Sequence, residues 1–175
     1  MRSINISNID KNLKVDTNIN EPDLCLYDVR EEPFRIYGLY NPTAEPVFKR
    51  MPDEVALDPT MNESVKSLYL HTSGGRIRFG TDSHYVALKV VMPYLSLMSH
   101  MPLTGQAGFD LYMDSPDGNE SIYMGSLAPW GTPEELAGGY EVRLRLPRAG
   151  FHYYTLNFIL FLKFLENIFL KQIFS

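Results

Sequence analysis

The chain has 175 residues, enough for one domain with a sizeable core and too few for two ordinary domains. Hydrophobic residues make up 45% and charged residues 21%, which excludes a disordered or fibrous chain. The net charge is -5 and the lysines and arginines form no run, which excludes a sequence-independent nucleic-acid binder. The single cysteine, Cys25, cannot form an internal disulfide, so the fold does not depend on an oxidising compartment.

Residues 1–22 form a polar lead-in that is rich in Asn, Asp and Lys. This segment contains no apolar stretch as long as a signal peptide needs, and we therefore expect a cytoplasmic protein. We divide the rest of the chain into a folded domain over residues 23–157 and an apolar tail over residues 158–175.

Short strands dominate the first half of the domain. Residues 23–29 and 33–40 are apolar and aromatic with a period near two, which is typical of two strands. Residues 41–59 contain four prolines and are predicted to form a loop with a brief strand near residues 47–51, because proline interrupts helices and central strands. Residues 64–74 return to the strand pattern and end in a Gly-Gly turn.

The clearest strands lie in the second half of the domain. Residues 76–91 are predicted to form two strands joined by the polar turn Gly80–His84. Residues 109–114 alternate and lead through a Ser-Pro-Asp-Gly turn into a return strand at 121–129, the pattern of a hairpin. Residues 140–147 alternate strictly between apolar and charged residues, which indicates a half-exposed strand.

Strands and turns recur at intervals of about 8–12 residues, and no convincing helix precedes residue 155. The pattern predicts an all-β fold, a jelly-roll-like antiparallel β-sandwich.

The tail is predicted to form a C-terminal amphipathic helix over residues 158–174, because its polar residues recur at spacings of three and four. Its charged residues make a transmembrane span too costly. The apolar face of this helix is left to cover the edge of the sandwich, to pair with another copy of the chain or to lie on a membrane surface.

Asp82, Ser83 and His84 are residue types of a hydrolase active site, which needs a nucleophile and a base within hydrogen-bond reach. Neighbouring residues of a turn point in different directions, however, and no oxyanion loop is evident. We expect Asp82 and Ser83 instead to satisfy backbone donors of the turn.

Asp110, Asp114 and Asp117 offer the oxygen ligands that calcium takes. Residues 110 and 114 would lie about 13 Å apart along a strand, at about 3.3 Å per residue, which is too far for one ion. We expect Asp110 to accept hydrogen bonds at a strand crossing. The histidines are too far apart in sequence for a zinc site, so no metal and no cofactor are expected.

Three sequence blocks, Phe48–Pro52, Ile77–Ser83 and Gly108–Met113, follow a known family pattern. The last contains Gly108-Phe109-Asp110-Leu111-Tyr112, which matches a "GxDLY" signature. The blocks resemble the amino-terminal β-sandwich domain of SGNH/GDSL-type esterases, over about residues 33–157. The resemblance implies a following hydrolase domain with its catalytic Ser in a G-D-S block and its His in a D-x-x-H block. Gly80–His84 inserts Thr between Gly and Asp, so no residue of this chain is assigned a catalytic role.

After Asn157 the family pattern leads into another core strand and then the hydrolase, whereas this chain continues with ILFLKFLENIFLKQIFS. This vocabulary is what AT-rich DNA yields out of frame, so we interpret the tail as a truncation or frameshift product. The missing strands would leave an open sheet edge, which predicts self-association of the chain through residues 158–174.

The resemblance implies an accessory domain, without hydrolase activity of its own, that packs against the hydrolase and helps to bind an acylated carbohydrate. Trp130 lies in a loop, where its indole is predicted to stack on a sugar ring or else to pack over the end of the sandwich. The candidate ligand-binding residues are Trp130, Asp82, Ser83, Asp110 and Tyr112. Two alternatives stay open: a free-standing carbohydrate-binding module and an intact esterase with an unrecognised site.

Overall fold

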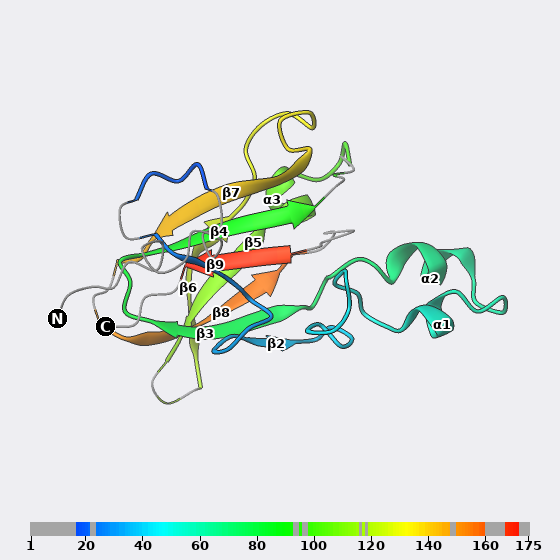
Figure 1. Cartoon of the computed structure of the whole chain (residues 1–175), viewed down its shortest axis with the longest axis horizontal. Coiled ribbons are helices and arrows are strands. Elements are labelled where there is room, and N and C mark those ends of the chain that lie inside the picture. The colour runs from blue at the N-terminus through cyan, green and yellow to red at the C-terminus, as the bar shows by residue number, and fades with distance from the viewer. Residues whose placement is uncertain are drawn as a thin grey trace, which may run out of the picture.

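A computed structural model describes residues 17–21, 24–92, 95, 98–115, 117, 119–147, 150–159 and 167–171. They form two antiparallel sheets that face each other (Figure 1). The four-stranded sheet has the order β1 (Leu26–Asp28), β9 (Asn167–Lys171), β4 (Tyr85–Met92), β7 (Gly138–Arg145). The five-stranded sheet has the order β2 (Arg35–Tyr37), β3 (Arg76–Thr81), β8 (His152–Phe158), β5 (Phe109–Asp114), β6 (Ser121–Leu127). The predicted all-β sandwich is confirmed.

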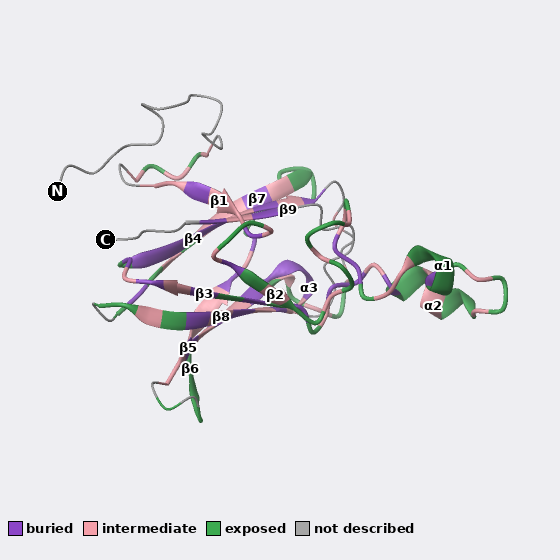
Figure 2. Ribbon diagram, turned by 60° about the horizontal axis from the view of Figure 1, so that its bottom comes forward, coloured by how far each residue is buried: buried purple, intermediate pink, exposed green. Residues whose placement is uncertain are grey.

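The core lies between the two sheets, where the buried residues of neighbouring strands meet (Figure 2). Leu111 and Leu156 are fully buried on the five-stranded sheet, and Leu88 and Leu170 are fully buried on the four-stranded sheet. Alternation along each strand turns every second side chain to this core and leaves the others on an outer face. The outer face of the five-stranded sheet carries the candidate site described below.

Three short helices lie outside the sheets: α1 (Asp53–Ala56), α2 (Glu63–Leu68) and α3 (Leu103–Ala107). The helices α1 and α2 project from one end of the sandwich as a separate lobe (Figure 1). The predicted strand over residues 64–74 is therefore wrong, as is the expectation that no helix precedes residue 155. The Asn62 side chain accepts a hydrogen bond from the Val65 N–H at 2.9 Å and caps α2, a signal that favours a helix start.

The predicted C-terminal helix is wrong wherever the structure describes it. Phe158 belongs to β8, and residues 167–171 form β9, which pairs with β1 on one side and β4 on the other. Ile168 and Leu170 alternate with Phe169 and are fully buried. Pairing on both edges and burial on one face outweigh a helical periodicity in so short a segment. Residues 160–166 and 172–175 lie outside the described residues.

The end of the polar lead-in lies against the sandwich. The Thr17 hydroxyl and the Asn18 N–H both donate to Glu141 Oε2 of β7, at 3.0 and 2.7 Å. Within the part of the chain that the structure describes, no helix has the length and apolarity needed to cross a membrane. Self-association through residues 158–174 stays a prediction.

Candidate functional site

The signature Gly108-Phe109-Asp110-Leu111-Tyr112 builds β5 and divides its side chains between two environments. Phe109 and Leu111 are fully buried in the core, and the Phe109 ring meets Phe158 edge-on with centroids 5.1 Å apart. Asp110 and Tyr112 take the alternate positions and lie on the outer face of the five-stranded sheet. The apolar residues of the motif thus fix the strand, and its polar residues face outward.

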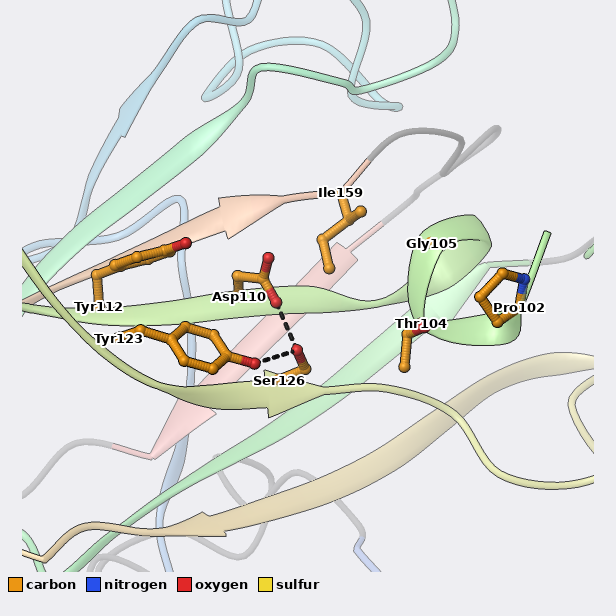
Figure 3. Close-up of a pocket in the computed structure, with 8 residues that line it drawn as sticks. All are labelled: Pro102, Thr104, Gly105, Asp110, Tyr112, Tyr123, Ser126 and Ile159. Carbon is orange, nitrogen blue, oxygen red and sulfur yellow. Dashed lines mark hydrogen bonds between the residues drawn. The ribbon is translucent and has the colours of Figure 1, made fainter.

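Asp110 and Tyr112 line an open pocket of about 430 Å³ on this outer face (Figure 3). The Tyr112 and Tyr123 rings form one end of the pocket, and the other end is formed by residues in and before α3. The eight lining residues are Pro102, Thr104, Gly105, Asp110, Tyr112, Tyr123, Ser126 and Ile159.

A short chain of hydrogen bonds crosses the pocket floor (Figure 3). The Ser126 hydroxyl donates to Asp110 Oδ1 at 2.5 Å, and the Tyr123 and Ser126 hydroxyl oxygens lie 2.8 Å apart. Because the single Ser126 proton points to a carboxylate that only accepts, Tyr123 must donate to Ser126. The other carboxylate oxygen, Asp110 Oδ2, makes no hydrogen bond with a described residue, so a charged acceptor is left open to the pocket.

A β-bulge in β6 brings the pocket residues together. Tyr123 pairs with Tyr112 and Ser126 pairs with Asp110. These two residues of β6 are three positions apart, so in a regular strand their side chains would face opposite sides of the sheet. The register shifts between Leu111 and Tyr112, and Gly125 in the bulge has a φ of 144°. The bulge therefore turns both hydroxyls to the outer face and places the Tyr112 and Tyr123 ring centroids 5.5 Å apart.

The helix α3 is fixed at the other end of the pocket by two contacts. A Cβ atom at Gly108 would collide with the Thr104 carbonyl oxygen, so the signature glycine is what lets α3 end directly against β5. The buried Tyr140 hydroxyl donates to the Ala107 carbonyl, and burial raises the pKa of Tyr140 well above its ordinary value. The phenol is therefore a permanent donor that ties β7 to the last residue of α3.

Comparison with known proteins identifies a family that is named after the same motif. The sequence model of one family, described as "GxDLY: N-terminus of Esterase_SGNH_hydro-type", matches residues 24–138. The chain belongs to this family. A search of curated protein sequences gave no match.

Two solved structures share the fold of this GxDLY domain. One is a GDSL-like lipase from Bacteroides ovatus ATCC 8483, with 18% identity, a TM-score of 0.65 and coverage of 86% of this chain and 41% of that one. The other is the salicylyl-acyltransferase SsfX3 from a tetracycline biosynthetic pathway, with 19% identity, a TM-score of 0.58 and coverage of 89% of this chain and 43% of that one. The GxDLY domain thus spans about two fifths of the length of either protein.

Of the five residues nominated from the sequence, only Asp110 and Tyr112 line the pocket. Trp130 lies in the loop between β6 and β7 and is 96% exposed, so it does not pack over the end of the sandwich. Hydrogen bonds between Thr132 and Glu135 hold this loop, with the Thr132 N–H donating to Glu135 Oε2 at 2.8 Å. The loop leaves β6 directly after Ser126 and Leu127, beside the pocket.

Asp82 and Ser83 lie in the turn between β3 and β4 and take no part in the pocket of the GxDLY domain. Ser83 is 4% exposed, its N–H donates to Thr81 Oγ1 at 3.1 Å and its Oγ accepts the Tyr85 N–H at 3.2 Å. Ser83 thus satisfies a backbone donor of the turn, as predicted. Asp82 differs, because its Oδ1 is buried and has no hydrogen-bond partner among the described residues.

The three aspartates weighed as calcium ligands serve separate contacts. Asp114 pairs with Arg78 at 2.5 Å, and Asp117 accepts hydrogen bonds from Ser115 and Asn119 that lower its pKa. Among the described residues no group of three His, Cys, Asp or Glu side chains is placed to hold a metal ion.

Proposed function

We propose that this GxDLY domain is an accessory domain of an SGNH-type esterase, without catalytic activity of its own, which packs against a hydrolase domain and helps to bind an acylated carbohydrate. The pocket on the signature motif carries this proposal. It combines an open carboxylate oxygen on Asp110, hydroxyls on Ser126 and Tyr123, and the exposed ring surface of two tyrosines. A carboxylate accepts hydrogen bonds from sugar hydroxyls, and an aromatic ring packs against the apolar face of a sugar.

The turn that resembles a hydrolase motif supports the non-catalytic assignment. The Ser83 side chain is buried and its Oγ accepts a backbone hydrogen bond, whereas His84 is exposed. A nucleophile needs a base within hydrogen-bond reach and access to its substrate, and Ser83 has neither. We expect the purified chain to hydrolyse p-nitrophenyl acetate at the rate of buffer alone. Turnover that Ser83→Ala abolishes would restore the intact-esterase hypothesis.

The exposed indole of Trp130 supports a packing surface next to the pocket. Tryptophan is enriched among residues that carry most of the energy of a protein interface, and here it is 96% exposed on a loop held by its own hydrogen bonds. We assign this loop to the contact with the hydrolase domain. The same exposure favours a second candidate function, a free-standing module in which Trp130 stacks on a sugar.

Titration calorimetry of the chain with acetylated xylo-oligosaccharides tests the ligand and separates the two functions. Asp110→Asn and Tyr112→Ala are expected to weaken binding at least tenfold, because each removes a different pocket contact. Tyr153→Ala is the control, since Tyr153 is 61% exposed on the same sheet but does not line the pocket. Binding that Trp130→Ala abolishes and Asp110→Asn leaves intact would favour the free-standing module. No binding of any acetylated oligosaccharide would remove the carbohydrate part of the proposal.

A further inference from the structure

A row of five polar and aromatic side chains crosses the whole outer face next to the pocket. Directly paired residues of neighbouring strands lie on the same face of a sheet, and the register connects one residue from each of the five strands. In the order of the strands they are Tyr37, Arg76, Asn157, Asp110 and Ser126. The row thus presents an aromatic ring, a cation, an amide, a carboxylate and a hydroxyl in sequence.

The cation and the carboxylate of this row do not pair with each other. Asp110 accepts from Ser126 on its far side, and Arg76 makes no ion pair or side-chain hydrogen bond with a described residue. Arg76 is exposed, and Asn157 between the two is half-buried with no side-chain hydrogen bond to a described residue. Three groups able to bind a ligand therefore stand side by side with free hydrogen-bonding capacity.

A second pair on the same sheet shows that distance does not prevent the contact. Arg78 on β3 reaches Asp114 on β5 at 2.5 Å, across Thr155 of β8. With strands about 4.8 Å apart and about 3.3 Å per residue, the backbones of that pair are about 12 Å apart, because Asp114 lies one row further along. Arg76 and Asp110 lie in one row and are about 10 Å apart by the same geometry. Arg78 and Asp114 therefore form an ion pair across the longer distance, whereas Arg76 and Asp110 do not pair across the shorter one.

A ligand that lies over Asn157 meets the cation of Arg76 at one end and the carboxylate of Asp110 at the other. This order of charges determines which chemical groups the ligand must carry and which way round it binds. A planar guanidinium binds a carboxylate with two hydrogen bonds, and no acid among the described residues pairs with Arg76. Asp110 would repel a carboxylate and accept hydrogen bonds from hydroxyls instead. The 45% exposed Tyr37 ring lies at the Arg76 end, and the Tyr112 ring lies two residues beyond Asp110 on β5, on the same face.

We propose that this row binds a sugar residue that carries a carboxylate, a uronic acid, with its carboxylate on Arg76 and its ring hydroxyls on Asp110 and Asn157. This inference rests on the proposed function, since it names the class of carbohydrate that the same face takes. The chain has a net charge of -5 and does not attract anionic polymers as a whole, so the preference comes from the local guanidinium.

The test compares two ligands that differ only in charge: a galacturonic acid trisaccharide and the same trisaccharide with its carboxyl groups reduced to hydroxymethyl groups. We expect the intact chain to bind the acidic trisaccharide at least tenfold more tightly, about 1.4 kcal/mol. Arg76→Gln should remove this preference and leave the affinity for the reduced trisaccharide unchanged. Arg145→Gln is the matched control, because it makes the same change of net charge at an exposed residue of the other sheet.

The outcomes separate the inference from the function on which it rests. If the chain binds both trisaccharides with equal affinity and Asp110→Asn abolishes this binding, the uronic acid inference is overturned, whereas a carbohydrate-binding function is kept. A preference for the acid that Arg145→Gln removes as fully as Arg76→Gln reflects net charge alone and also overturns it. Binding of neither trisaccharide overturns the inference, whereas binding of acetylated neutral oligosaccharides would still support the proposed function.

Discussion

Replacement of Leu170 by alanine tests the assignment of the tail as a sheet strand. Leu170 is fully buried and lies between Tyr27 of β1 and Leu88 of β4. A buried Leu→Ala change costs about 2–5 kcal/mol, because it removes apolar contact and leaves a cavity. With a urea dependence of about 2 kcal/mol per molar, a loss of about 3 kcal/mol lowers the unfolding midpoint by about 1.5 M. Such a loss is a large part of the total stability of an ordinary domain, about 5–15 kcal/mol.

Far-ultraviolet circular dichroism in urea is the suitable assay for this change. Tryptophan fluorescence is not, because the single indole, Trp130, is 96% exposed in the folded chain and stays in water on unfolding. Phe169→Ala serves as the control, since Phe169 lies on the opposite face of β9 and is only half-buried. We expect it to lower the midpoint by less than half as much as Leu170→Ala. Equal shifts for the two variants, or no shift for either, would refute the placement of β9 in the sheet.

Two further changes test the pocket and the helical lobe. Gly125→Ala forces a side chain onto a backbone with a φ of 144° and places its Cβ atom 3.0 Å from Leu144. We expect the free energy of unfolding in urea to fall by about 1–3 kcal/mol and the acetylated oligosaccharide to bind more weakly. Ser121→Ala, at an exposed position of the same strand, should change neither quantity. Lys49→Met removes a buried cation that pairs with Glu45 at 2.7 Å and Asp53 at 2.9 Å, and because Asp53 is half-exposed we expect a loss of only about 1–2 kcal/mol. Burial lowers the pKa of Lys49, but the hydrogen bonds with the two acids outweigh it and raise the pKa above 10.5, so this contribution is complete at neutral pH and is lost only as the pH rises past that value. The urea midpoint of Lys49→Met should therefore lie below that of the unmodified chain by the same amount at pH 6 and at pH 9. A difference that vanishes at pH 9 would contradict the ion-pair explanation.

Strands were predicted correctly where the alternation of apolar and polar residues is complete within one segment of the sequence. The alternating residues 109–114 and 140–147 were predicted to form strands and they form β5 and most of β7, and the turn between β3 and β4 was recognised from its polar residues. The helix α2 was missed because it holds only two apolar residues, Val65 and Leu68, too few to define a period, and the cap at Asn62 was not recognised. The strand β9 was missed because its burial depends on β1 and β4, which lie far away in the sequence.

The candidate site was predictable only in part, and for the same reason. Asp110 and Tyr112 follow from the signature and from the alternation of one strand. Tyr123 and Ser126 were missed, because an odd spacing on β6 places them on opposite faces unless the bulge at Gly125 is known. The row that joins Arg76 to Asp110 depends on the pairing of three strands from distant parts of the chain. The signature thus finds two of the eight lining residues, and the strand register adds Tyr123 and Ser126.

The position of β9 also sets the order in which the domain can mature during synthesis. The three residues of β1 pair with residues 169–171, so β1, the first strand of the described residues, gains this neighbour only after β9, the last of them, has been made. Until then β4 has β7 on one edge and no partner on the other. Such distant pairings make folding slow and leave a nascent strand edge open to other chains. Premature release or nicking before residue 167 would therefore yield a fragment that a chaperone must hold, rather than a smaller stable domain.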